Sequence, residues 1–191
     1  MKQSISYFIA LIFFVISSCT KDGMDPLPEA TQIGANSFGC KVNGKVWIPN
    51  GSHSLFVSIP ALSAGMYQSY QGVKHFSIDA RKDPSTLNTE EDSYDDLSID
   101  IILPFSTGQA IIDKNCFSCE LYCPLSSMRL KVQGIYNGAC YMTDSLHPGR
   151  INFTRVDSVN RIYSGTFEFT AIDKRSGKTI SATDGRFDVK W

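Results

Sequence analysis

The chain has 191 residues and is nearly neutral, with 18 lysine and arginine residues against 19 aspartate and glutamate residues. Nucleic acids and anionic membrane surfaces bind to basic faces, so this balance argues against both as direct partners. The sequence contains no phosphate-binding glycine loop and no HExxH zinc motif. The length fits one domain that buries most of its apolar surface.

The first eighteen residues have the layout of an export signal. A single positive charge, Lys2, precedes an apolar run from Ile5 to Ile16. This run is about 12 residues long, whereas a helix needs about 20 residues to cross a bilayer. We therefore predict that residues 1–18 form a cleaved signal peptide and not a permanent transmembrane helix.

Residues 16–19, Ile-Ser-Ser-Cys, resemble the lipobox of bacterial lipoproteins, in which an aliphatic and two small residues precede the cysteine that receives the lipid. The resemblance implies cleavage before Cys19 and lipid attachment to this cysteine. Each buried CH₂ group of an acyl chain contributes about 0.8 kcal/mol, so several chains anchor a protein permanently. We expect a lipid-anchored outer-membrane protein that faces the periplasm or the cell surface.

The stretch that begins at Cys19 and ends at residue 36 contains Pro26, Pro28 and Gly34 and few large apolar residues. Such a composition is typical of a flexible linker. We therefore predict a lipidated tether over residues 19–36 and a single domain over residues 37–191.

From residue 37 onward, apolar and polar residues alternate in short segments, and no segment has a clear helical period. Phe38, Cys40 and Val42 alternate up to an Asn-Gly pair, which predicts a first hairpin. Further strands are predicted near residues 55–59, 76–80, 97–103, 128–132, 151–153, 163–172 and 186–191. About nine or ten short strands without helices predict an all-β, antiparallel sandwich or barrel, and the pattern does not choose between them.

The last two of these segments show the alternation most clearly. One face of the segment from 163 to 172 carries Phe167, Phe169 and Ala171. The final segment alternates in the same way, which puts Asp188 in its polar set. We expect the apolar sets to face the core and the polar sets to face away from it.

Two sequence blocks resemble a family of uncharacterised Bacteroidetes lipoproteins. The first is GANSFGCKVNGKVW at residues 34–47, and the second begins at Ser164 and contains TDGRFDV. The resemblance implies a secreted, lipid-anchored β domain. It supplies no known catalytic residues.

Six cysteines are present, so lipidation of Cys19 leaves an odd number in the domain. In an exported protein the expected state is disulfide bonding, with at least one thiol left free, bound to metal or paired between molecules. Cys40 is alternatively a small buried hydrophobic residue of the first strand. The candidate disulfide cysteines, with open connectivity, are Cys40, Cys116, Cys119, Cys123 and Cys140.

The spacing of Cys116, Cys119 and Cys123 also suits a zinc site completed by Cys140 or a histidine. Oxidation outside the cytoplasm competes for these thiols, and the pattern lacks two separated CxxC pairs. Residues 79–100 carry eight carboxylates, which suit calcium, but the EF-hand glycine is missing. We therefore predict a solvated acidic loop here, no metal site and no cofactor.

No set of residues has the pattern of a catalytic site, so no catalytic residue is predicted. Tyr67 and Tyr70 lie in a polar loop and are candidate ligand-binding residues for a glycan, although they could instead cover the end of the core. The sequence thus favours a non-enzymatic binding or interaction module whose partner is a glycan or an envelope protein. The alternatives are a secreted glycan or peptide hydrolase that uses carboxylates between Asp79 and Asp100, and a structural component of the envelope.

Overall fold

The computed structural model describes residues 27–53, 58–68, 72–83, 95–103, 106–114, 125–132 and 138–191. These residues form thirteen β-strands and no helix, which confirms the predicted all-β class. None of them belongs to a helix that could cross a membrane. The strands are β1 (Ser37–Val42), β2 (Lys45–Trp47), β3 (Ser52–His53), β4 (Ser58–Ile59), β5 (Leu62–Gln68), β6 (Lys74–Lys82), β7 (Asp95–Ile102), β8 (Gly108–Ile112), β9 (Ser127–Val132), β10 (Ala139–Met142), β11 (Gly149–Asp157), β12 (Ile162–Ile172) and β13 (Thr179–Lys190).

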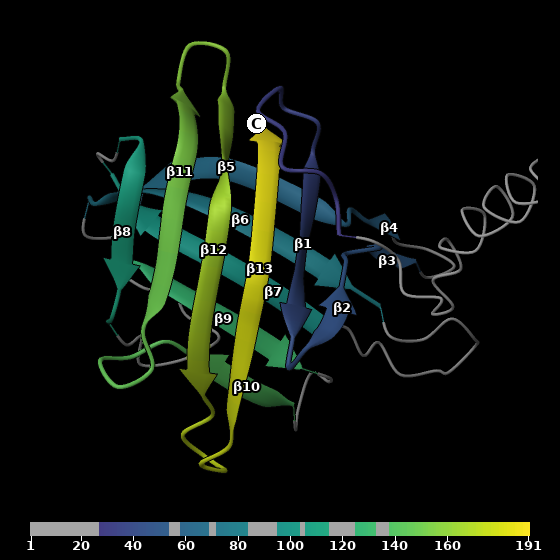
Figure 1. Cartoon of the computed structure of the whole chain (residues 1–191), viewed down its shortest axis with the longest axis vertical. Coiled ribbons are helices and arrows are strands. Elements are labelled where there is room, and N and C mark those ends of the chain that lie inside the picture. Colours follow the sequence, from purple (N-terminus) through teal and green to yellow (C-terminus); the bar gives the residue numbers. More distant parts are fainter. Residues whose placement is uncertain are drawn as a thin grey trace, which may run out of the picture.

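Eleven strands form one antiparallel sheet in the order β2-β1-β13-β12-β10-β9-β7-β6-β5, with β11 and β8 added beside β12. The remaining strands, β3 and β4, pair only with each other. The long sheet curls into a half-barrel with two facing layers (Figure 1). The front layer holds β8, β11, β12, β13, β1 and β2, and the strands of the back layer, β5, β6, β7, β9 and β10, cross it steeply (Figure 1).

The layers join at the end of β12. Most of this strand pairs with β11, but Ile172 pairs with Met142 of β10. One long strand can therefore belong to the front layer and also lead into the back layer, as in orthogonally packed β-sheets.

The core lies between the two layers and follows the predicted alternation. Phe167, Phe169 and Ala171 are buried, as expected from the sequence. Rings from opposite layers meet there: the centroid of Phe76 on β6 lies 4.5 Å from that of Tyr163 on β12, in an edge-to-face contact. Such aromatic contacts add to the free energy gained by burying the two rings.

A β-bulge interrupts β13. Two steps along β12, from Phe167 to Phe169, are matched by three steps along β13, from Gly185 to Ala182. Asp184, inside the bulge, has a positive φ of 55°. A Cβ atom on Gly185 would lie 2.5 Å from the carbonyl oxygen of Phe167, so the position accepts only glycine without a backbone shift. The missing side chain of Gly185 leaves room for the buried ring of Phe167, whose Cδ atoms lie 2.7 Å from the place that a Cβ would take.

The described residues ahead of β1, numbers 27–36 and called the strap below, lie against the outer face of β13. They cover Asp188, which is 0% exposed although its strand position predicts a residue facing away from the core. Asp188 accepts five hydrogen bonds, from the hydroxyls of Thr31 (2.6 Å) and Ser164 (2.7 Å) and from the N–H groups of Ile33 (3.0 Å), Gly34 (2.9 Å) and Ala35 (3.0 Å). Burial raises the pKa of this carboxyl, but the hydrogen bonds outweigh it and lower the pKa to about 2.

The strap has two further contacts with the front layer. Arg155 of β11 donates a hydrogen bond to the carbonyl of Gln32. Pro28 packs on Gly39 of β1, where a Cβ atom would lie 2.7 Å from the Cδ atom of the proline. These residues fall in the segment that the sequence assigns to the tether, and in the structure they lie against the domain.

The two described cysteines differ in state. Cys40 is a free, fully buried thiol, and burial raises its pKa to about 12. The structure therefore favours the alternative of a small buried hydrophobic residue for Cys40 over a disulfide. Cys140 is disulfide-bonded. The other candidate cysteines lie outside the described residues, so the pairing stays a prediction.

Candidate functional site

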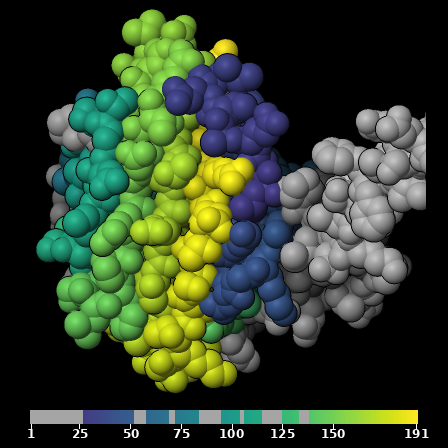
Figure 2. Space-filling view, in the orientation of Figure 1, coloured from purple at the N-terminus to yellow at the C-terminus, as the bar shows by residue number. Residues whose placement is uncertain are grey.

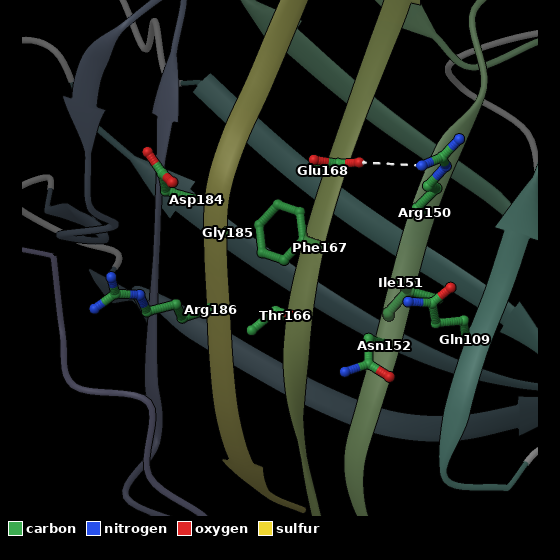
Figure 3. Close-up of a pocket in the computed structure, with 10 residues that line it drawn as sticks. All are labelled: Gln109, Arg150, Ile151, Asn152, Thr166, Phe167, Glu168, Asp184, Gly185 and Arg186. Carbon is green, nitrogen blue, oxygen red and sulfur yellow. Dashed lines mark ion pairs between the residues drawn. The ribbon is translucent and has the colours of Figure 1, made fainter.

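A groove with a volume of about 410 Å³ lies on the outer face of the front layer. Strands β8, β11, β12 and β13 form its floor, and their surfaces lie side by side with the strap next to β13 (Figure 2). The bulge in β13 contributes Asp184 and Gly185 to its lining (Figure 3). The volume falls within the range of ligand-binding pockets, about 300–1,000 Å³.

A row of four polar residues crosses the floor of the groove. Strand pairing places Gln109 beside Asn152, Asn152 beside Thr166, and Thr166 beside Arg186. Neighbouring strands are about 4.8 Å apart, so the row spans roughly 14 Å. Within the described part of the chain, no hydrogen bond or ion pair engages the side chains of Gln109, Asn152 or Thr166. These three residues therefore offer donors and acceptors to a ligand.

Charged residues form one rim of the groove. Arg150 and Glu168 face each other at 3.9 Å, and both side chains are well exposed (Figure 3). Asp184 pairs with Lys41 at 2.8 Å, and its hydrogen bond to Lys41 lowers the pKa of the carboxyl. Exposed ion pairs contribute little to stability, so a ligand can displace them at low cost.

The strap lies next to the groove, beyond Arg186, and none of its residues is part of the lining. Thr166 of β12 pairs with Arg186 of β13. Two residues further along these strands, Ser164 pairs with Asp188, and the strap covers this second pair. Arg186 donates a hydrogen bond from Nη1 to the carbonyl of Pro28 at 3.0 Å. Its side chain reaches from the groove toward the strap (Figure 3).

Tyr67, a predicted ligand-binding residue, lies on the back layer and not in this groove. Its hydroxyl donates to Oδ1 of Asp100 at 3.1 Å, and its ring stacks on His75 with centroids 4.9 Å apart. Asp100 and His75 are buried, and neither ring nitrogen of His75 has a hydrogen-bond partner. The hydroxyl of Tyr67 is thus already engaged within the protein.

Burial shifts the pKa values of Tyr67, His75 and Asp100. It lowers the pKa of His75 and raises that of Asp100, while the charge of Arg129 acts against the shift at Asp100. Burial and the neighbouring Asp100 raise the pKa of Tyr67. Shifted pKa values are common at catalytic sites, but His75 and Asp100 are buried and cannot meet a large substrate.

The structure describes some of the carboxylates between Asp79 and Asp100 that the sequence proposes for a hydrolase. Asp96 forms a two-point ion pair with Arg81, at 2.6 and 3.2 Å, and Asp79 accepts a hydrogen bond from Ser77 at 2.9 Å. None of the described carboxylates between residues 79 and 100 lines the groove. The rest of that acidic segment lies outside the described residues.

Serine, histidine and aspartate also occur on the back layer, but the described residues do not form a Ser-His-Asp catalytic triad there. His75 lies on β6 and Ser127 on β9, with β7 between them. Neither the ring of His75 nor the Ser127 hydroxyl has a hydrogen-bond partner, so the two are not joined. In the ranges that the structure describes, no three histidine, cysteine or acidic residues are placed to hold a metal ion.

Several predicted site residues cannot be placed. Cys19, Cys116, Cys119, Cys123 and Tyr70 lie outside the described residues, and their roles stay predictions.

The groove residues themselves were not predicted from the sequence. Gln109 belongs to β8, a strand that the alternation does not reveal, while Asn152 and Thr166 are ordinary outward-facing strand residues. No signal in one sequence shows which outward-facing residues become neighbours.

Comparisons with protein-family models, with curated proteins and with solved structures find no match for this chain. The resemblance to a lipoprotein family therefore stays an expectation, and the functional argument depends on the groove.

Proposed function

We propose that the protein is a lipid-anchored binding module of the cell envelope, attached through Cys19, and that the groove binds an oligosaccharide. The observation that carries this proposal is a set of three polar side chains on the floor of an open groove, Gln109, Asn152 and Thr166, that have no partner among the described residues. The proposed binding face lies on β8, β11, β12 and β13, and the tyrosines named from the sequence are not needed for it.

The chemistry of the row suits a sugar. An amide side chain carries both donors and an acceptor, and a threonine hydroxyl can act as either. Sugar hydroxyls have the same double capacity, so Gln109, Asn152 and Thr166 can each exchange a bound water for a ligand hydroxyl.

Binding without hydrolysis fits the charges better than catalysis does. Glu168 and Asp184 are the carboxylates of the groove, and glycoside hydrolysis needs one carboxyl that stays protonated as a general acid. The pKa of Asp184 is lowered by Lys41, which is the opposite shift. Both carboxylates are also paired with cations.

The test is an array of neutral and acidic oligosaccharides probed with the full mature protein and with Asn152→Ala. We expect the wild-type protein to bind a defined group of glycans and Asn152→Ala to bind it at least about fivefold more weakly, since a lost hydrogen bond costs roughly 1 kcal/mol. Thr154→Ala is the matched control, because Thr154 is exposed on the same strand but does not line the groove.

The same samples separate the alternatives. Release of shorter sugars by the wild-type protein, abolished by Glu168→Gln, would replace the binding module with a hydrolase. Equal glycan binding by Asn152→Ala and the wild-type protein would show that the groove is not the binding face. Loss of fatty-acid labelling in Cys19→Ala tests the anchor separately.

A further inference from the structure

The four charged residues of the groove differ in their ion pairs. Lys41 neutralises Asp184 at 2.8 Å, and Arg150 faces Glu168 at 3.9 Å. Arg186 differs, because within the described residues no carboxylate lies in ion-pair range of its guanidinium. Among the described residues, Arg186 is thus the charged residue of the groove that has no direct ion pair, although its charge helps to lower the pKa of Asp184.

The strap holds this charge in place. Asp188 fixes residues 31–35, and Pro28 lies flat on Gly39 because that position has no side chain. The carbonyl of Pro28 is thereby held where it accepts the hydrogen bond from Nη1 of Arg186. A guanidinium has five N–H donors, so this one contact leaves others for a ligand.

We propose that the ligand is an acidic oligosaccharide, with the carboxylate of a uronic acid bound by Arg186 and the sugar rings lying along the polar row toward Gln109. This inference rests on the proposed glycan-binding function and adds the class of ligand and the residue that selects it. Arginine suits a carboxylate because its planar N–H groups can make two parallel hydrogen bonds.

An acidic peptide is the competing ligand, and the groove fits it less well. The floor is the face of a sheet, and β11, β12 and β13 are each paired on both sides, so a peptide that lies on this face cannot add to the sheet as a strand. The floor side chains next to Arg186 are a hydroxyl and two amides, which match sugar hydroxyls rather than the apolar side chains of a peptide.

The test measures the affinity of the full mature protein by calorimetry for three probes: trigalacturonate, its methyl ester and triglutamate. We expect trigalacturonate to bind at least about tenfold more tightly than the ester, because only the acid makes charged hydrogen bonds to Arg186. Raising the salt concentration should weaken the binding of trigalacturonate and leave the binding of its methyl ester unchanged.

Variants assign the selectivity to one residue. Arg186→Gln should reduce the affinity for trigalacturonate by about tenfold or more, to the level of the ester, and leave binding of the ester unchanged. Arg186→Lys keeps the charge and should retain part of the selectivity. Arg175→Gln is the control, because Arg175 is exposed in the turn between β12 and β13, outside the groove. Circular dichroism shows whether each variant is folded.

Each outcome bears on a different statement. Equal affinity for the acid and the ester, both weakened by Asn152→Ala, overturns the acidic ligand class and leaves glycan binding standing. Triglutamate binding as tightly as trigalacturonate assigns the groove to acidic peptides and overturns this inference. If neither sugar probe binds, the inference is wrong. If the glycan array is also negative, the proposed function fails with it.

Discussion

Replacing Asp188 with asparagine exchanges one carboxylate oxygen for an amide nitrogen at the centre of the strap contacts. Oδ1 accepts from the N–H of Gly34, and Oδ2 accepts from the N–H groups of Ile33 and Ala35. The hydroxyls of Thr31 and Ser164 can rotate to face an amide nitrogen, but a backbone N–H cannot become an acceptor. Even the better orientation of the amide therefore leaves the Gly34 N–H without a partner.

The magnitude follows from two estimates of this one change. A buried donor without a partner costs about 1–3 kcal/mol. The carboxyl, whose pKa falls from 3.8 to about 2 on folding, contributes roughly 2.5 kcal/mol at neutral pH, and the amide lacks this contribution. We therefore expect Asp188→Asn to lower the free energy of unfolding by about 2–4 kcal/mol.

Urea denaturation of the full mature protein at pH 7, followed by tryptophan fluorescence, measures this change. Asp184→Asn is the matched control, because its carboxylate lies on the same strand but is half exposed and forms an exposed ion pair with Lys41. We expect the control to change the free energy of unfolding by less than about 1 kcal/mol. If Asp188→Asn is no less stable than Asp184→Asn, the strap is not held as argued.

Three further predictions concern other parts of the molecule. The folded-state pKa of Asp188 is depressed, so its contribution is present above pH 4 and disappears as the pH falls toward 2; wild-type stability should drop over this window by about 2 kcal/mol more than that of Asp188→Asn, measured by urea titrations at each pH. Gly185→Ala should lower the free energy of unfolding by about 1–3 kcal/mol or more, because its Cβ would meet the Phe167 carbonyl, whereas Gly65→Ala, which meets nothing within 4 Å, should have little effect; equal effects would contradict the packing argument. Cys40 should resist iodoacetamide in the folded protein and react after unfolding, because the thiol is buried and its pKa is about 12; rapid native labelling by mass spectrometry would show that the thiol is accessible.

The sequence predicts the fold class because burial on one face of a strand leaves a period of two. The segment around Phe167 and Phe169 shows this period, and both side chains are buried as expected. β8 lacks the pattern, since Ile111 and Ile112 are adjacent and only Ile112 is buried. An edge strand of five residues therefore leaves too weak a signal.

Asp188 shows a second limit of prediction from the alternation of apolar and polar residues. Alternation correctly separates it from the core-facing residues of β13, but it says nothing about what covers the outer face. The strap buries it through residues 157 and 155 positions away, Thr31 and Ile33. The groove has the same origin, because strands distant in the sequence bring Gln109, Asn152 and Arg186 into one row. Such neighbours depend on strand order, which a single sequence does not encode in any local pattern.

The strap also determines how the domain would respond to mechanical force. From Cys19 to Thr31 the chain can extend by at most about 40 Å, so a domain anchored at Cys19 as proposed would stay close to its membrane. A pull on the lipid would reach the contacts of Pro28 with Gly39 and Arg186 and then the contacts of Thr31 with Asp188. Arg186 and Asp188 belong to β13, which is hydrogen-bonded to β1 on one side and to β12 on the other. The load would enter the middle of the front layer in shear, where many hydrogen bonds must break together, instead of peeling an edge strand away one bond at a time.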